Sequence, residues 1–131
     1  MPKNSYVTLS AEFCAGHFYE QKKWPPQKNR EFFGKCYSPY GHGHNYRVEA
    51  TFEISDKADI SELQKQISDL AETFDHRHLN HDIPEFKEVI PTTENIAIYF
   101  AQKIKSSSPP SPLLKKLRLF ESSDLLTELS L

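Results

Sequence analysis

The sequence predicts an α+β fold in which a four-stranded antiparallel sheet carries two helices on one face. Stretches with a two-residue apolar alternation lie near both ends of the chain, and two stretches with helical apolar spacing lie between them. The order is therefore two strands, two helices and two strands, which is typical of α+β domains. A chain of 131 residues, 37% of them hydrophobic, is expected to form a single domain over residues 1–131.

Composition excludes several classes of function. A net charge of -2 and a pI near 6.3 provide no positive field for nucleic acid. The N-terminal residues lack the apolar core of a signal peptide, and no apolar run approaches the ~20 residues of a membrane span. We therefore expect a cytoplasmic protein with no nucleic-acid or membrane partner.

Its two cysteines, Cys14 and Cys36, are too few for a disulfide scaffold, which leaves Cys36 free for chemistry.

The first strand is expected to run from Val7 to His17. Its residues alternate, so that His17 continues the mainly apolar face while Cys14 points away from it. Residues 19–41 mix prolines, charges and aromatics without a period, and therefore predict a long loop.

The second strand is expected over residues 42–54, where His42 and His44 also continue an apolar face. If the two strands pair as a long antiparallel hairpin, its loop side brings His17 near His42 and His44. Three imidazoles then converge at one end of the sheet.

Both helices have capping signals. In "DISELQKQISDLAETF", Asp59 is the expected N-cap, with Glu62 as its capping-box partner, and the apolar residues share one face. The second helix is expected to begin at "TTEN", where Thr92 or Thr93 can cap it. The proline-rich residues 106–112 end it as a surface connection.

The C-terminal stretch predicts two short strands around a turn at residues 122–124, with Leu117, Leu119 and Glu121 on one side. A four-stranded sheet of this kind has two open edges. Because open edges invite pairing with another chain, association into a ring is expected to cover them.

The three histidines form the strongest candidate site. An H-x-H pair on a strand can chelate one ion, and His17 from the paired strand supplies a third imidazole. Three protein ligands leave the fourth position of zinc open, as in catalytic sites. The alternative is that each histidine only packs or lies exposed at a strand end. Gly41 and Gly43, beside His42, allow close approach of a ligand or of the backbone, or serve the turn into the strand.

Other candidates have weaker signals. A metal and a histidine can lower the pKa of the Cys36 thiol and make it a nucleophile or base, but a loop cysteine is more often an incidental thiol. Asp75 can orient the adjacent imidazole of His76, although neighbours in sequence need not face each other.

Two carboxylates are further candidates. Glu94 suits the first turn of a helix, and Glu121 is either a turn residue or a carboxylate for a donor-rich ring ligand. No catalytic role is expected for Cys14, His78 or His81.

Five motifs together resemble one family. "FCAGHF", "FGKCYSPYGHGHNY", "DHRHLN", "PTTENIA" and "LFESSD" occur in the order, and at about the spacings, of the 6-pyruvoyltetrahydropterin synthase family. This family includes the 6-carboxytetrahydropterin synthase of queuosine biosynthesis. The resemblance covers nearly the whole chain and implies the tunnelling fold (T-fold), in which trimers close into a barrel and usually stack as a homo-hexamer.

The resemblance also implies roles for single residues. The implied zinc ligands are His17, His42 and His44; the implied catalytic residues are Cys36, Asp75 and His76, with the last two contributed across a subunit interface; the implied pterin-binding residues are Thr93, Glu94 and Glu121. Zinc then acts as a Lewis acid and Cys36 as the base, while His76 shuttles protons.

The implied reaction is elimination of triphosphate from 7,8-dihydroneopterin triphosphate to give 6-pyruvoyltetrahydropterin, a step of tetrahydrobiopterin biosynthesis. The interval between Cys36 and His42 favours this product slightly. One alternative is the queuosine branch, which releases acetaldehyde from the same substrate to give 6-carboxytetrahydropterin. A second alternative is a non-catalytic protein that binds zinc and a pterin.

Overall fold

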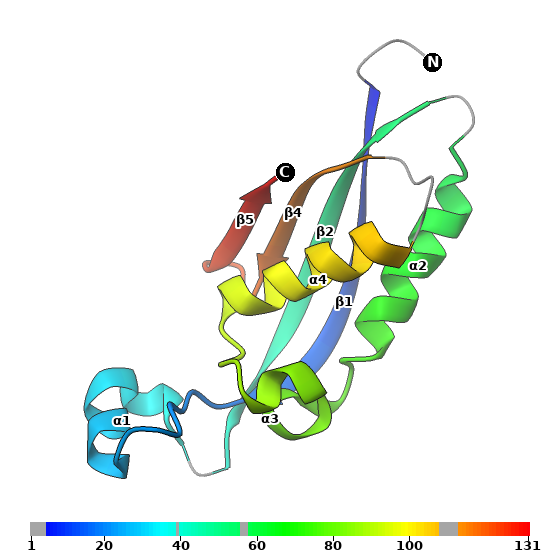
Figure 1. The fold of residues 1–131 in the computed structure, drawn as a ribbon. Helices are drawn as coiled ribbons and strands as arrows, with labels where there is room; N and C mark the ends of the chain where they lie inside the picture. The colour runs from blue at the N-terminus through cyan, green and yellow to red at the C-terminus, as the bar shows by residue number, and fades with distance from the viewer. Residues whose placement is uncertain (1–4, 39, 56–57, 108–112) are drawn as a thin grey trace.

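A long antiparallel hairpin is the central element of the fold. The structure is a computed structural model that describes residues 5–38, 40–55, 58–107 and 113–131. Strands β1 (Ser5–His17) and β2 (His42–Ile54) pair without a break, from Ser5 opposite Ile54 to His17 opposite His42. The predicted hairpin is confirmed, and its two loop-side ends lie side by side at one end of the sheet (Figure 1).

The sheet has the order β3-β1-β2-β4-β5. Strands β4 (Leu113–Phe120) and β5 (Leu126–Ser130) continue it with antiparallel pairing, as predicted. The strand β3 (Arg77–His78) was not predicted; it pairs in parallel with Ala15 and Gly16 of β1, because the chain passes that edge after leaving the first long helix. Two residues are too few to show an alternating pattern in the sequence.

Two long helices, α2 (Ile60–Glu72) and α4 (Thr93–Ser107), lie on the same face of the sheet (Figure 1). The Asp59 carboxylate accepts the Glu62 N–H at 3.0 Å, and the Thr92 hydroxyl accepts the Asn95 N–H at 3.1 Å, so each helix has an expected cap. The core between helices and sheet is closed by aromatic rings, chiefly Phe13, Tyr46, Phe74 and Phe100. Among the described residues, no helix has the length and apolar character needed to span a bilayer.

The prediction of a long loop over residues 19–41 was wrong in part. This segment contains helix α1 (Pro26–Phe33) and the 3-10 turn η1 (Gly34–Cys36), and it projects from the sheet (Figure 1). Helix α1 is only eight residues long, and its one buried residue is the polar Asn29, so it offers no buried apolar stripe that would reveal it in the sequence. It is held by buried Asn29, whose amide accepts the Gln21 N–H at 2.7 Å and donates to the Gln21 carbonyl at 3.1 Å.

Two further short elements, α3 (Leu79–Asp82) and η2 (Pro84–Lys87), connect β3 to α4. Together they place Leu79, Ile83 and Phe86 in the core. Of the proline-rich connection predicted at residues 106–112, positions 108–112 lie outside the described residues.

The face of the sheet away from the helices is charged. The Arg47 guanidinium lies 3.4 Å from Glu12 and 3.1 Å from Glu49, which links β1 to β2. Arg118 on β4 lies 3.5 Å from Glu49 and 3.5 Å from Glu128, which continues the series to β5. The sheet thus has an apolar face under the helices and a polar face of alternating charge.

Candidate metal and catalytic site

Three histidines meet where β1 ends and β2 begins. Each of His17, His42 and His44 offers a ring nitrogen, and these atoms all lie within 4.8 Å of one another. The centroid of the His17 ring is 4.6 Å from that of His42 and 5.1 Å from that of His44. Strand register brings them together, because His17 is paired directly with His42 and His44 lies two residues further on the same face.

The facing nitrogens of this cluster have no hydrogen-bond partner. His17 Nε2, His42 Nδ1 and His44 Nε2 are buried polar atoms without one in the described part of the chain. An unpaired buried polar atom is costly, and three that converge require a common explanation. Neutral imidazole nitrogens are ligands of zinc and similar cations, so the three histidines fit a metal ion.

The tautomer of His17 is set by a main-chain group. Its Nδ1 lies 2.8 Å from the Pro91 carbonyl, which can only accept, so Nδ1 carries the proton and Nε2 keeps its lone pair. Burial lowers the pKa of His17 to about 4, and the nearby His42 and His44 act in the same direction. His17 is therefore neutral at physiological pH, the form that binds a metal. The Tyr46 hydroxyl lies 3.3 Å from the same Nδ1.

Glu121 extends into the cluster from the end of β4. Its Oε1 lies 3.4 Å from His17 Nε2 and 3.3 Å from His44 Nε2, and the residue is 8% exposed. Its main-chain N–H donates to the Leu125 carbonyl, so Glu121 is at the start of the turn and is also directed inward. The structure thus places this carboxylate beside the three histidines.

Cys36 approaches the cluster through Tyr19. The Cys36 carbonyl accepts the Tyr19 N–H at 2.8 Å, and the Tyr19 ring packs edge-on against His17 with centroids 5.2 Å apart. The Cys36 thiol is half-buried and free. The loop that carries the cysteine is therefore fastened to the chain two residues beyond a candidate metal ligand.

Gly41 is the glycine that the geometry requires. Its φ is +80°, and an added Cβ would lie 2.9 Å from the His17 carbonyl oxygen and 2.9 Å from His78 Nε2. The same construction at Gly43 meets only an ordinary contact of 3.5 Å. Of the two explanations open at Gly41, the turn and a close approach, both apply.

Asp75 and His76 form a pair away from the cluster. Asp75 Oδ2 lies 2.9 Å from His76 Nδ1, and Asp75 Oδ1 accepts the Cys14 N–H at 2.7 Å. The bond from Cys14, followed by that to His76, lowers the pKa of Asp75. Cys14, whose N–H holds Asp75, precedes Tyr19 by five residues. Five residues of extended chain span roughly 16 Å. In the described residues no contact joins this pair to Cys36, and His76 is 83% exposed at the sheet edge.

The start of α4 is fixed beside the histidines, because the Pro91 carbonyl accepts from His17. Thr93 is buried there, whereas Glu94 is exposed. His78 and His81 stack on each other with centroids 4.3 Å apart and do not belong to the metal cluster, as expected.

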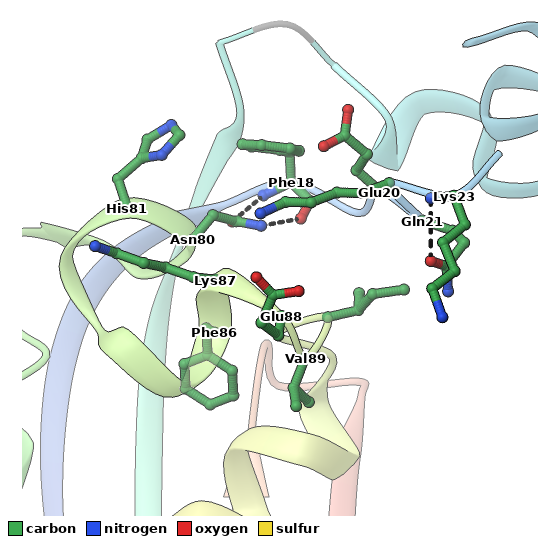
Figure 2. A pocket seen from close by; sticks show the side chains of 12 residues that line it. Phe18, Glu20, Gln21, Lys23, Asn80, His81, Phe86, Lys87, Glu88 and Val89 are labelled. Carbon is green, nitrogen blue, oxygen red and sulfur yellow. Dashed lines mark hydrogen bonds between the residues drawn. The ribbon is translucent and has the colours of Figure 1, made fainter. Parts of the chain in front are cut away.

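A separate cavity of about 320 Å³ lies between the chain that follows β1 and the segment that connects β3 to α4. Its wall includes Phe18, Asn80 and Lys87. Figure 2 shows the Asn80 amide aligned with the main chain of Phe18: it accepts the Phe18 N–H at 2.9 Å and donates to the Phe18 carbonyl at 2.9 Å. These two hydrogen bonds fix the main chain directly after His17. The candidate metal ligands do not line the cavity.

Sequence reasoning missed Tyr19, Tyr46 and the Pro91 carbonyl as neighbours of His17. Tyr19 continues the odd-numbered face of the first strand, so the alternation could have been extended by one step. Nothing in a sequence marks which main-chain carbonyl meets a side chain 74 residues earlier.

A five-stranded sheet whose four longer strands pair antiparallel, with two long helices on one face and three histidines at the end of its central hairpin, defines a tunnelling-fold protein with a metal-type site. Residues 6–130 match the family described as 6-pyruvoyl tetrahydropterin synthase. The chain therefore belongs to the 6-pyruvoyl tetrahydropterin synthase family and is an enzyme of pterin biosynthesis. The resemblance inferred from the five motifs is confirmed.

Individual relatives agree with this assignment. A 6-pyruvoyl tetrahydrobiopterin synthase of Poecilia reticulata is 35% identical, over 89% of this chain and 84% of the relative. The structure of a 6-pyruvoyl tetrahydropterin synthase of Caenorhabditis elegans is 33% identical, with a TM-score of 0.85 over 99% of both chains. A dihydroneopterin monophosphate aldolase of Pyrococcus furiosus is 33% identical, over 94% of this chain and 95% of the relative.

We predict that His44→Ala lowers the affinity for Zn²⁺ by more than about 10²-fold, because even changes in residues that only orient metal ligands cost 10- to 100-fold. The measurement is metal content per chain by elemental analysis after dialysis against graded chelator. His81→Ala removes an imidazole outside the cluster and is expected to retain the metal. Equal retention by both variants would exclude His44 as a ligand.

Proposed function

We propose that the protein is a zinc-dependent lyase that eliminates triphosphate from 7,8-dihydroneopterin triphosphate and yields 6-pyruvoyltetrahydropterin. The supporting observation is the convergence of three unpaired imidazole nitrogens with the Glu121 carboxylate at the hairpin end. Cys36 lies in the adjoining loop. This is a metal-type site with an acceptor and a thiol beside it, as elimination from a pterin side chain requires.

The proposed zinc ligands are His17, His42 and His44. Zinc bound there would supply Lewis-acid polarisation of an oxygen on the substrate side chain. The protein supports this role by holding His17 in the neutral Nδ1–H tautomer through Pro91.

The remaining residues bind substrate and move protons. Glu121 accepts hydrogen bonds from the N–H donors of the pterin ring, and Thr93 and Glu94 line the same pocket at the start of α4. Cys36, as thiolate, takes the proton from the side-chain carbon next to the polarised oxygen. His76, oriented by Asp75 at 2.9 Å, transfers protons during the tautomerisation that accompanies loss of triphosphate.

We further propose that a neighbouring subunit completes the site in a homo-hexamer built from two trimers. Within one chain Asp75 is fastened to Cys14, five residues before Tyr19, and the Cys36 loop is bonded to Tyr19. In the described residues β3 covers only Ala15 and Gly16 at the outer edge of β1, and no strand covers the outer edge of β5. Edge-to-edge pairing of subunits would cover these strands and bring the pair from one chain to the cysteine of the next.

Incubation of the zinc-loaded protein with 7,8-dihydroneopterin triphosphate tests the function, with the pterin product identified by mass. We expect release of triphosphate and a product that keeps the three-carbon side chain. Acetaldehyde release would assign the protein to the queuosine branch. Carbon–carbon cleavage of dihydroneopterin monophosphate, offered in parallel, would indicate an aldolase. Binding of zinc and pterin without turnover of either substrate would leave a non-catalytic protein.

We predict that Cys36→Ala binds zinc normally and lowers kcat by about 10²- to 10⁴-fold, the contribution of a positioned general base. Steady-state rates and metal content are measured on the same preparation. Cys14→Ala is the matched control, since its side chain lies outside the site and the main-chain groups that hold Asp75 remain. Full activity of Cys36→Ala would exclude the thiol as the base.

We also predict that two inactive variants complement each other. Cys36→Ala and His76→Ala, refolded together, should form mixed oligomers in which about a quarter of the sites, by random pairing across an interface, contain both native residues. Activity is measured after tag-based isolation of the mixed species. Absence of recovery in verified mixed oligomers would place both residues in one chain.

A further inference from the structure

Tyr19 contacts two parts of the proposed site. Its ring packs edge-on against the candidate metal ligand His17, with planes 80° apart. Its main-chain N–H donates to the carbonyl of Cys36, the proposed base. Burial raises the pKa of its hydroxyl, and the charge of Glu121 acts in the same direction. Tyr19 thus links the three-histidine cluster to the loop that carries Cys36.

The ring of Tyr19 is held while its hydroxyl is left available. The ring lies between His17 and Phe33, whose centroid is 5.7 Å away in an edge-on arrangement. Within the described part of the chain the Tyr19 hydroxyl makes no hydrogen bond. Its oxygen also does not belong to the buried polar atoms that lack a partner, so it is not fully enclosed by protein. A fixed ring with an accessible hydroxyl is suited to contact a molecule that enters the site.

Tyr46 is the other tyrosine at the cluster, and its arrangement differs. Tyr46 is 1% exposed, and its hydroxyl lies 3.3 Å from His17 Nδ1. Its hydroxyl therefore serves the metal ligand and has no access to substrate. The comparison separates a tyrosine whose hydroxyl supports His17 from one whose hydroxyl makes no hydrogen bond in the described residues and is not sealed from solvent.

Chemistry indicates what the Tyr19 hydroxyl would meet. A phenol is protonated at neutral pH and donates one hydrogen bond. The substrate side chain carries alcohols, so the electron pair of the first C–H bond passes into the C=N bond of the dihydropterin ring, and tautomerisation then makes the first side-chain carbon a ketone. When Cys36 takes the proton from the carbon next to this ketone, the electron pair moves to the ketone oxygen, which gains negative charge before triphosphate leaves. A neutral, positioned donor stabilises such charge more in the transition state than in the ground state.

We propose that the Tyr19 hydroxyl donates a hydrogen bond to the substrate side-chain oxygen that gains negative charge as Cys36 removes the neighbouring proton. This inference rests on the proposed function and adds to it a donor on the protein. The proton passes from carbon to sulfur, and Tyr19 keeps its own proton throughout. No bond to Tyr19 forms or breaks.

Tyr19→Phe tests the proposal, because it keeps the ring against His17 and removes only the hydroxyl. We expect kcat to fall by about 10²-fold, as for loss of one donor to a developing oxyanion. KM is expected to change by less than about threefold, since the bond strengthens mainly in the transition state. Zinc content and the visible absorption spectrum of the Co²⁺-loaded protein should match those of the wild type. Tyr6→Phe, at the far end of β1, is the matched control.

Tyr46→Phe provides the contrasting result. It removes a hydroxyl beside His17 Nδ1 and should alter the Co²⁺ spectrum or the metal affinity, which Tyr19→Phe should not. A kcat for Tyr19→Phe within about twofold of wild type, or a loss that merely follows reduced metal content, would overturn the proposal. If the wild-type protein turns over, such a result removes only the role of Tyr19. If the wild type does not, the proposed function fails and the role of Tyr19 fails with it.

Discussion

The register between β1 and β2 is the constraint on which the rest of the site depends. Side chains alternate along each strand, so a slip of one residue would turn His42 and His44 to the face of the sheet opposite His17. Thirteen paired residues on each strand fix that register, and burial of Phe13, Tyr46 and Val48 under the helices makes a slip costly. The cluster of three histidines is thus held in place by the same packing that stabilises the core.

Two segments next to the helices hold His17 and the peptide that follows it. The Pro91 carbonyl, just before α4, accepts the His17 Nδ1 proton and so determines which nitrogen faces the cluster. On the opposite side Asn80 pairs with the main chain of Phe18. His17 therefore has its ring and its following peptide fixed by two different segments. Such fixation from outside the ligand set is what makes a metal site rigid.

Much of the fold could be predicted from the sequence because the long elements have clear periods and caps. Alternation identified the hairpin, and Asp59 and Thr92 cap the helices that were expected at those positions. Helix α1 escaped prediction because it is only eight residues long and its one buried residue is the polar Asn29. The two-residue strand β3 is too short to give a pattern.

The candidate site could be predicted only in part. Strand parity was sufficient to bring the three histidines together. The nearness of Glu121 depends on how β4 ends, and the separation of His76 from Cys36 depends on tertiary placement. A main-chain acceptor such as Pro91 has no sequence signature, since every residue has a carbonyl.

The alternating charges on the uncovered face of the sheet also determine how the protein can grow. Arg47 and Arg118 each lie between two carboxylates, so their charges are paired in a series that runs across β1, β2, β4 and β5. Stacking a second layer on this face would remove these charges from water at a high desolvation cost. The strand edges carry no such cost, because main-chain groups there gain partners on pairing. The ring proposed above would therefore grow at the strand edges, along the hydrogen bonds of the sheet.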